Sequence, residues 1–126
     1  MSTYWQQFRD DFVQVKGGKV AKVDLPELGR KKYVAVYFSA HWCPPCRTFT
    51  PTLARFYLQH KQQHGNDFEL LFVSLDKDVT QFTEYMTGVP MPWPAIEFEK
   101  AGDSELLEFC GEGIPCLVVL DGQGKV

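Results

Sequence analysis

One stretch decides the fold of this chain, 33-YVAVYFSAHWCPPCRTFTP-51. Its first part, residues 33–38, is apolar on both faces, which is typical of a strand buried between helices in a partly parallel sheet. Beyond the Cys-Pro-Pro-Cys turn, apolar side chains recur at helical spacing, at Cys46, Phe49, Leu53, Phe56 and Tyr57. The stretch therefore predicts a central strand that turns directly into a long amphipathic helix, with a kink at Pro51.

A hairpin is predicted upstream of this stretch. Residues 12–15 and 20–23 are strand-like and flank Gly17 and Gly18. Paired glycines allow the positive φ angles that a tight hairpin turn requires.

A second strand and helix are predicted downstream. Residues 69–75 have the pattern of a buried strand, and residues 78–87 that of a helix. Asp78 and Gln81 have the spacing of a capping box at its start. The apolar residues of this helix, Val79, Phe82 and Met86, are expected to point inward.

The last third of the chain is broken into short segments. Residues 90–94 contain three prolines and predict a rigid connection rather than a helix. Asp103 is expected to cap a short helix that carries Leu106, Leu107 and Cys110. Residues 117–120 predict a strand, and residues 121–124 a hairpin turn.

Alternating strands and helices, opened by a hairpin, indicate an α/β fold with a mixed central sheet flanked by helices. The 126 residues contain no internal repeat and no Pro/Gly/Ser linker, so residues 1–126 are expected to form a single domain. A net charge of −3 does not favour nucleic-acid binding, and the longest apolar run, residues 33–40, is too short to span a membrane. The amino end lacks a signal-peptide pattern, which favours the cytoplasm.

The two cysteines of the Cys-Pro-Pro-Cys turn have the spacing of a thiol–disulfide exchange site. A thiol attacks a disulfide only as the thiolate, and the unpaired N–H groups at a helix start favour negative charge at Cys43. Pro44 and Pro45 stiffen the turn, because their fixed φ suits the first helical positions. Cys46 can break a mixed disulfide on Cys43, and Trp42 would shield one side of it.

A zinc site is the main alternative reading of the cysteines. Cys43 and Cys46 would form one half of it, and Cys110 and Cys116 the other. The five residues between the second pair, with a proline beside Cys116, are poor geometry for a zinc knuckle. We therefore expect no metal. Because the Gly-x-Gly at 111–113 lacks the third glycine of a dinucleotide fingerprint, no nicotinamide or flavin cofactor is expected either.

The sequence resembles the tryparedoxin and nucleoredoxin branch of the thioredoxin superfamily. The similarity rests on residues 42–47, WCPPCR, preceded by 36-VYFSA-40, and on several motifs that follow in the branch's order and spacing. These are Phe49-Thr50-Pro51, Phe56-Tyr57, Phe72-Val73-Ser74-x-Asp76, Met91-Pro92-Trp93 and Gly113-Ile114-Pro115. The similarity covers roughly residues 12 to 126.

The resemblance implies a thioredoxin-like fold and thiol–disulfide oxidoreductase activity. It makes Cys43 the nucleophile and Cys46 the resolving thiol, and makes Pro115 a cis-proline facing them. Together with Ile114, Pro115 would leave backbone groups free to pair with a substrate strand beside Cys43. Trp93 is expected to line the substrate surface or to anchor the proline-rich loop.

The resemblance also suggests partners. The substrates would be protein disulfides, for example in a peroxiredoxin-type peroxidase, and an external thiol reductant would regenerate the pair. The alternative is a redox-sensing interaction module of the nucleoredoxin kind, in which the disulfide state controls partner binding with little turnover.

Three features depart from the family pattern. Tyr37 stands where thioredoxins carry a buried acid, so a carboxylate proton relay at that position is absent. Cys116 follows Pro115 and is either a third thiol near the active site or a small buried strand residue, whereas Cys110 is expected in the core. The family domain continues past the last turn into one more strand and a terminal helix, so this sheet edge is expected to be exposed.

Overall fold

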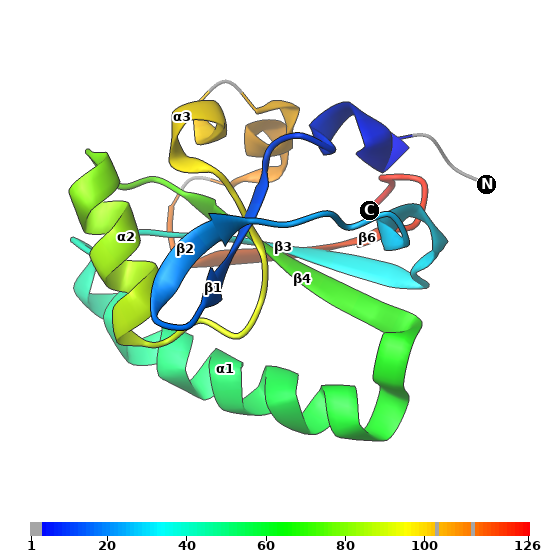
Figure 1. Cartoon of the computed structure of the whole chain (residues 1–126), viewed down its shortest axis with the longest axis horizontal. Coiled ribbons are helices and arrows are strands. Elements are labelled where there is room, and N and C mark those ends of the chain that lie inside the picture. Colours follow the sequence, from blue (N-terminus) through cyan, green and yellow to red (C-terminus); the bar gives the residue numbers. More distant parts are fainter. Residues whose placement is uncertain (1–3, 103, 112) are drawn as a thin grey trace.

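The computed structural model describes residues 4–102, 104–111 and 113–126, apart from the side chain of residue 66. These residues form one mixed sheet of six strands with the spatial order β2-β1-β5-β4-β3-β6 (Figure 1). The strands are β1 (Phe12–Lys16), β2 (Lys19–Lys22), β3 (Tyr33–Ser39), β4 (Phe68–Ser74), β5 (Ala95–Ile96) and β6 (Cys116–Asp121). The predicted α/β architecture with its amino-terminal hairpin is confirmed.

Helices cover both faces of the sheet (Figure 1). The α-helices are α1 (Pro44–His64), α2 (Val79–Gly88) and α3 (Phe98–Ala101). The 3₁₀ helices are η1 (Tyr4–Phe8), η2 (Leu28–Arg30), η3 (Gly65–Asp67) and η4 (Glu105–Phe109). Helices α1 and α2 pack on one face, and η1, η2, α3 and η4 on the other. Within the described residues, no helix combines the length and the apolar character needed to cross a bilayer.

Strand β3 lies between β4, to which it runs parallel, and β6, to which it runs antiparallel. Because successive side chains of a strand point to opposite faces, its residues divide between two cores. Val34, Val36 and Phe38 join the core beneath η1 and η4, and Tyr37 joins the core beneath α1 and α2. This two-sided burial explains why the sequence of β3 is apolar throughout.

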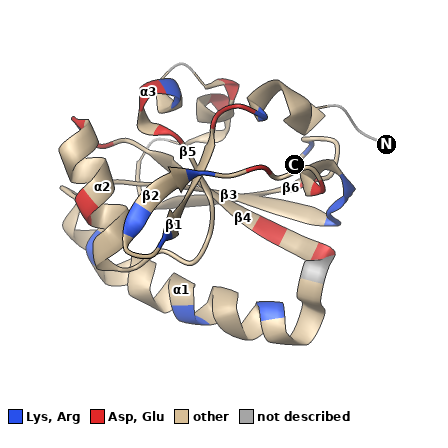
Figure 2. Cartoon of the chain, viewed as in Figure 1, with Lys and Arg blue, Asp and Glu red and all other residues tan. Residues whose placement is uncertain are grey.

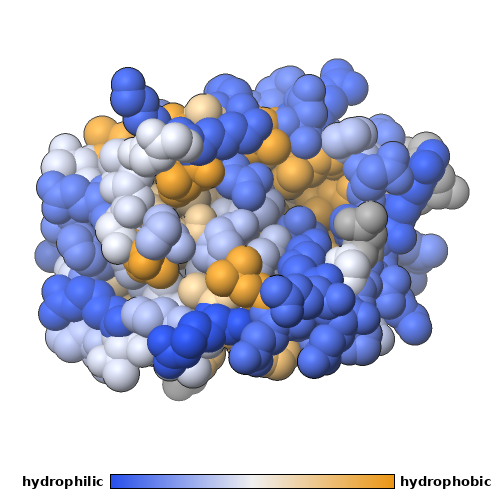
Figure 3. All heavy atoms as spheres, turned by 60° about the horizontal axis from the view of Figure 1, so that its bottom comes forward, coloured by the Kyte–Doolittle hydropathy of each residue, from blue (hydrophilic) through white to orange (hydrophobic). Residues whose placement is uncertain are grey.

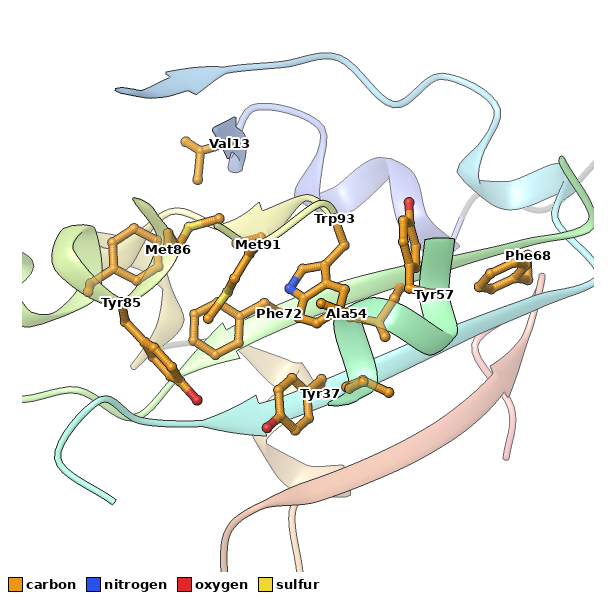
Figure 4. Close-up of a cluster of buried hydrophobic side chains, with 14 residues drawn as sticks. Val13, Tyr37, Ala54, Tyr57, Phe68, Phe72, Tyr85, Met86, Met91 and Trp93 are labelled. Carbon is orange, nitrogen blue, oxygen red and sulfur yellow. The ribbon is translucent and has the colours of Figure 1, made fainter. Parts of the chain in front are cut away.

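Aromatic side chains fill the core under α1 and α2 (Figure 4). Trp93 lies at its centre, with edge-to-face contacts to Tyr37 and Tyr57 at ring-centroid distances of 6.0 and 5.6 Å. Aromatic pairs in this geometry contribute about 0.5–1.5 kcal/mol beyond the burial of their area.

Some predicted inward positions are wrong. Val79 is 48% exposed, and Tyr85 occupies the core beside Phe82 and Met86 instead. Phe49 and Phe56 of α1 are also exposed, at 37% and 57%. Helical spacing identified the correct helices, but a 3.6-residue period cannot locate the edge of the buried stripe.

The caps of two helices also refine the predictions. Asp78 accepts a hydrogen bond from the Gln81 N–H at 2.8 Å, as expected, but the Gln81 side chain caps the N–H of Lys77 rather than that of Asp78. The predicted cap Asp103 lies outside the described residues. Ser104 caps η4, where its Oγ accepts from the Leu106 N–H at 3.1 Å.

The surface carries charges of both signs and includes an apolar groove. Figure 2 shows basic and acidic residues along the chain, with only basic ones on α1. The groove, about 280 Å³ in volume, lies beside α1, and its lining includes Tyr33, Phe56, Leu117 and Val119. With α1 turned forward, Figure 3 shows apolar atoms reaching the surface among hydrophilic ones.

Candidate active site

The turn from β3 into α1 places Cys43 at the N-cap of the helix. The Cys43 N–H donates to the Ala40 carbonyl at 3.2 Å, and the Cys43 carbonyl accepts from the Arg47 N–H at 3.0 Å. Pro44 and Pro45 take the first helical positions, where a missing N–H costs no intrahelical bond. The Cys43 side chain therefore lies at the positive end of a 21-residue helix dipole.

Both thiols of the turn are free and largely screened from water. Cys43 is 5% exposed and Cys46 is fully buried, in a small cluster with Ala40 that Leu75 and Ile114 cover. Burial raises the pKa of Cys46, the hydrogen bond with Cys43 raises it further, and a hydrogen bond from Ser39 opposes the rise. Cys46 is thus held as a neutral thiol behind the more accessible sulfur.

A second loop closes over the Cys43 sulfur. The Ile114–Pro115 peptide is cis, as the family resemblance implied, and the Cys43 Sγ lies 3.9 Å from the Ile114 carbonyl that it faces. The structure therefore brings Cys43 and Cys46 close to Ile114, which lies 71 residues after Cys43 in the sequence. The Val89–Pro90 peptide, for which no expectation was made, is also cis.

Trp42 forms the rim of the site. The residue is 45% exposed, and its Nε1–H donates to the Leu75 carbonyl at 3.0 Å. The Lys77 ammonium lies 5.9 Å from the ring centroid. Trp42 thus presents a fixed apolar surface directly beside Cys43.

Trp93 does not reach this surface. Its side chain is fully buried in the core under α1, and Figure 4 shows it enclosed by side chains of β3, β4 and α1. The expectation that it lines the substrate surface is wrong, and the alternative, anchoring of the proline-rich loop, agrees with the structure. Its Nε1–H has no hydrogen-bond partner among the described residues.

Asp76, which belongs to one of the motifs of the resemblance, has a role at the site that the sequence did not predict. Its Oδ1 accepts from the His41 N–H at 2.6 Å, and its Oδ2 accepts from the Ser74 hydroxyl at 2.7 Å. Burial raises the pKa of Asp76, although these two donors oppose the rise. Asp76 thereby ties the loop after β4 to the loop that carries Cys43. An acidic residue directly after a buried strand was the available signal.

A chain of buried hydroxyl groups lies behind the resolving thiol. Ser39 Oγ hydrogen-bonds to the Tyr85 hydroxyl at 2.6 Å, and Tyr85 hydrogen-bonds to Thr50. Thr50 also hydrogen-bonds to Tyr37 at 2.7 Å and donates to the Cys46 carbonyl at 2.8 Å. Together with the Ser39 contact to Cys46, these bonds form a closed circuit around that residue.

The hydrogen bonds of the hydroxyl circuit can reverse their direction, but the circuit cannot take up an additional proton. Each hydroxyl has a single proton to donate, so the Cys46 thiol can donate into the chain, and Ser39 can donate to the thiolate after the proton has left. Burial raises the pKa of both Tyr37 and Tyr85, so neither phenol ionises at neutral pH. The circuit therefore solvates both states of Cys46, and the absent carboxylate leaves proton removal to another base.

Comparison with known proteins agrees with this geometry. A family model described as thioredoxin-like matches residues 29–126. The chain belongs to the thioredoxin-like family.

Within this family, the chain lies in the tryparedoxin and nucleoredoxin branch. It is 46% identical to mouse nucleoredoxin over 96 residues, which cover 75% of this chain and 21% of that protein. It is 42% identical to probable nucleoredoxin 1 of Arabidopsis thaliana over 116 residues, 91% of this chain and 19% of that protein. The chain thus spans about a fifth of the length of these curated relatives.

The fold matches solved tryparedoxins over nearly the whole chain. Tryparedoxin II of Crithidia fasciculata superposes with a TM-score of 0.77 at 33% identity, covering 96% of this chain and 81% of that one. Tryparedoxin I of Leishmania major gives 0.75 at 32% identity, covering 95% and 80%. The recognised branch and the thioredoxin-like fold are confirmed.

The second pair of cysteines lies outside this thioredoxin-like site. Cys110 and Cys116 are partly buried against the core on the η4 side of the sheet. Among the described residues, no three His, Cys, Asp or Glu side chains are placed to hold a metal ion. A zinc site built from all four cysteines therefore has no support in the structure.

Proposed function

We propose that this chain is a thiol–disulfide oxidoreductase that reduces disulfides in proteins. The proposal rests above all on one observation, that a thiol at the N-cap of a long helix faces the Ile114 carbonyl beside a cis-proline. The second thiol, Cys46, lies one turn deeper and is fully buried. This arrangement separates an attacking sulfur from a resolving sulfur.

The reaction proceeds in two exchange steps. The Cys43 thiolate attacks one sulfur of the substrate disulfide, forms a mixed disulfide, and releases the other substrate sulfur as a thiolate. Cys46 then loses its proton and attacks the Cys43 sulfur, which releases the second substrate thiolate and leaves a Cys43–Cys46 disulfide. Two electrons pass to the substrate, and an external thiol reductant returns two electrons to the pair.

The surrounding residues hold the substrate strand against Cys43. The Ile114 carbonyl and the chain before Pro115 offer backbone groups for strand addition, which gives affinity without side-chain specificity. The exposed face of Trp42 adds an apolar contact on the other side of the sulfur. Pro44 and Pro45 keep the turn rigid, so that the attacking sulfur does not move when the substrate binds.

The proposed reductant and substrate are inferred from the tryparedoxin and nucleoredoxin branch rather than from the geometry of the site. One tryparedoxin II structure holds glutathionylspermidine, a low-molecular-weight thiol conjugate. We propose a thiol of this class as the reductant and a protein disulfide, such as that of a peroxiredoxin-type peroxidase, as the substrate. Four free cysteines suit a reducing compartment such as the cytoplasm.

The test is reduction of insulin by dithiothreitol, with wild type, Cys43→Ser and Cys46→Ser. We expect catalysis by the wild type, none by Cys43→Ser, and a trapped mixed disulfide on Cys46→Ser. Cys110→Ser is the matched control, because it removes a thiol outside the site, and its activity should equal that of wild type. Turnover by Cys43→Ser would refute the proposed nucleophile.

The same assay separates the enzyme from a redox-sensing module. A folded wild type that forms the Cys43–Cys46 disulfide but does not catalyse insulin reduction would favour the sensor. Its partner would then bind in one redox state only.

A further inference from the structure

The second cysteine pair is brought together by two elements that meet on one face of the sheet. Cys110 follows η4 directly, and its N–H donates to the Leu107 carbonyl at 3.1 Å. Cys116 opens β6, where it pairs with Phe38 of β3. Both cysteines pack against the same core, the one that η4 covers.

The alternation of β6 explains why Cys116 faces Cys110. Cys116, Val118 and Leu120 contact the core on the η4 side. Leu117 and Val119 point to the opposite face and line the apolar groove beside α1. Cys116 points to the same face of the sheet as Val118 and Leu120. Its thiol therefore lies on the face that η4 covers, and Cys110 directly follows η4.

The two thiols are neighbours and are both partly exposed. Burial raises the pKa of Cys110, and its interactions with Cys116, a hydrogen bond among them, raise it further. Both residues are partly exposed, in contrast to Cys43 and Cys46. Neighbouring thiols at a partly open surface are candidates for a disulfide bond.

We propose that Cys110 and Cys116 are a second redox-active dithiol, which a small disulfide such as glutathione disulfide oxidises to an intramolecular disulfide. One cysteine thiolate attacks glutathione disulfide and releases one glutathione, and the other cysteine then displaces the second glutathione. The pair loses two protons and two electrons, and the oxidant gains both as two molecules of glutathione. The step requires neither Cys43 nor Cys46.

The disulfide would close a short ring that includes Ile114 and Pro115 of the proposed site. Residues 111–115 lie between the two cysteines in the sequence, and they include the cis-proline Pro115 and Ile114, whose carbonyl oxygen lies 3.9 Å from the Cys43 Sγ. Oxidation would tie both ends of this segment together. Oxidation or reduction of the second pair would therefore take place next to the surface proposed to receive the substrate strand.

The test uses the 126-residue chain with Cys43→Ser and Cys46→Ser, in which only the second pair remains. After exposure to glutathione disulfide, we expect the loss of both thiols and a mass decrease of two hydrogen atoms. Cleavage after Glu112, which lies between the two cysteines in the sequence, should then give fragments that separate only after reduction. This variant cannot carry out the proposed exchange reaction, so the result is independent of the proposed function.

Matched controls define the outcome that would overturn the proposal. Adding Cys110→Ser or Cys116→Ser to this variant should leave one thiol that carries glutathione and no linked fragments. In wild type, oxidation should remove four thiols rather than two. If both cysteines of the double variant stay reduced, or carry only glutathione, while circular dichroism shows a folded protein, the pair is not a redox dithiol.

Discussion

The hydroxyl circuit behind Cys46 predicts unequal costs for removing its two phenol groups. The Tyr85 hydroxyl makes close hydrogen bonds to both Ser39 and Thr50 and a longer one, 3.4 Å, to the Cys46 carbonyl. The close hydrogen bond of the Tyr37 hydroxyl is the one to Thr50, and its interactions with Ser39 and Tyr85 are secondary. A buried neutral hydrogen bond contributes about 0.5–1.5 kcal/mol net. Tyr85→Phe should therefore lower the free energy of unfolding by about 1–3 kcal/mol, and Tyr37→Phe by about half as much.

The two substitutions should also be coupled, because both phenols share the Thr50 hydroxyl. Residues in one hydrogen-bond network show interaction energies of about 0.5–3 kcal/mol in double-mutant cycles. Urea unfolding of wild type, both single variants and the double variant, followed by far-UV circular dichroism, measures this coupling. Tyr33→Phe is the control, since Tyr33 is 44% exposed and its change should stay within about 0.5 kcal/mol.

An equal or reversed order of the two unfolding free-energy costs would refute this prediction. If Tyr37→Phe costs as much as Tyr85→Phe, or if the two costs add without coupling, the hydroxyl groups do not form the circuit described above.

The remaining predictions concern the core, the acid at the site and one close backbone contact. Trp93→Ala should cost about 3–5 kcal/mol in urea unfolding, because the indole is fully buried, and Trp93→Phe should leave the insulin-reduction rate unchanged. Because burial raises the pKa of Asp76, its contribution to stability is greatest below the ordinary value of 3.8 and is lost as pH rises through its folded value. Asp76→Asn should flatten this dependence, seen as a smaller fall in unfolding free energy with pH than in wild type. Gly122→Ala should destabilise by about 1–3 kcal/mol, because its new Cβ would lie 2.7 Å from the Lys31 carbonyl oxygen, whereas Gly88→Ala meets no atom within 4 Å and should not destabilise.

Much of the fold follows from local pattern. The apolar run of β3 predicted a doubly covered strand because a strand buried on both faces cannot alternate. The glycine pair in the first hairpin has positive φ at both Gly17 and Gly18, as the turn requires. Short α3 and β5 were missed, since four and two residues carry too little periodicity to recognise.

The site could be predicted only in part, because some of its residues meet through contacts between distant parts of the chain. Cys43 and Cys46 are neighbours in the chain, so their spacing alone carries the chemistry. Asp76 and the hydroxyl circuit depend on contacts across the fold, and a single Ser, Thr or Tyr in a buried strand gives no sign of its partner. The burial of Trp93 likewise depends on packing beneath α1, which no local pattern encodes.

The apolar groove beside α1 has a practical consequence for anyone who purifies this protein. Environment-sensitive dyes such as anilinonaphthalene sulfonate fluoresce when they leave water for an apolar surface. The groove, lined by Phe56, Leu117 and Val119, offers such a surface on the native protein. Dye-based melting curves will therefore start from a bright baseline, and a dye titration of the folded protein will report directly on how open that groove is.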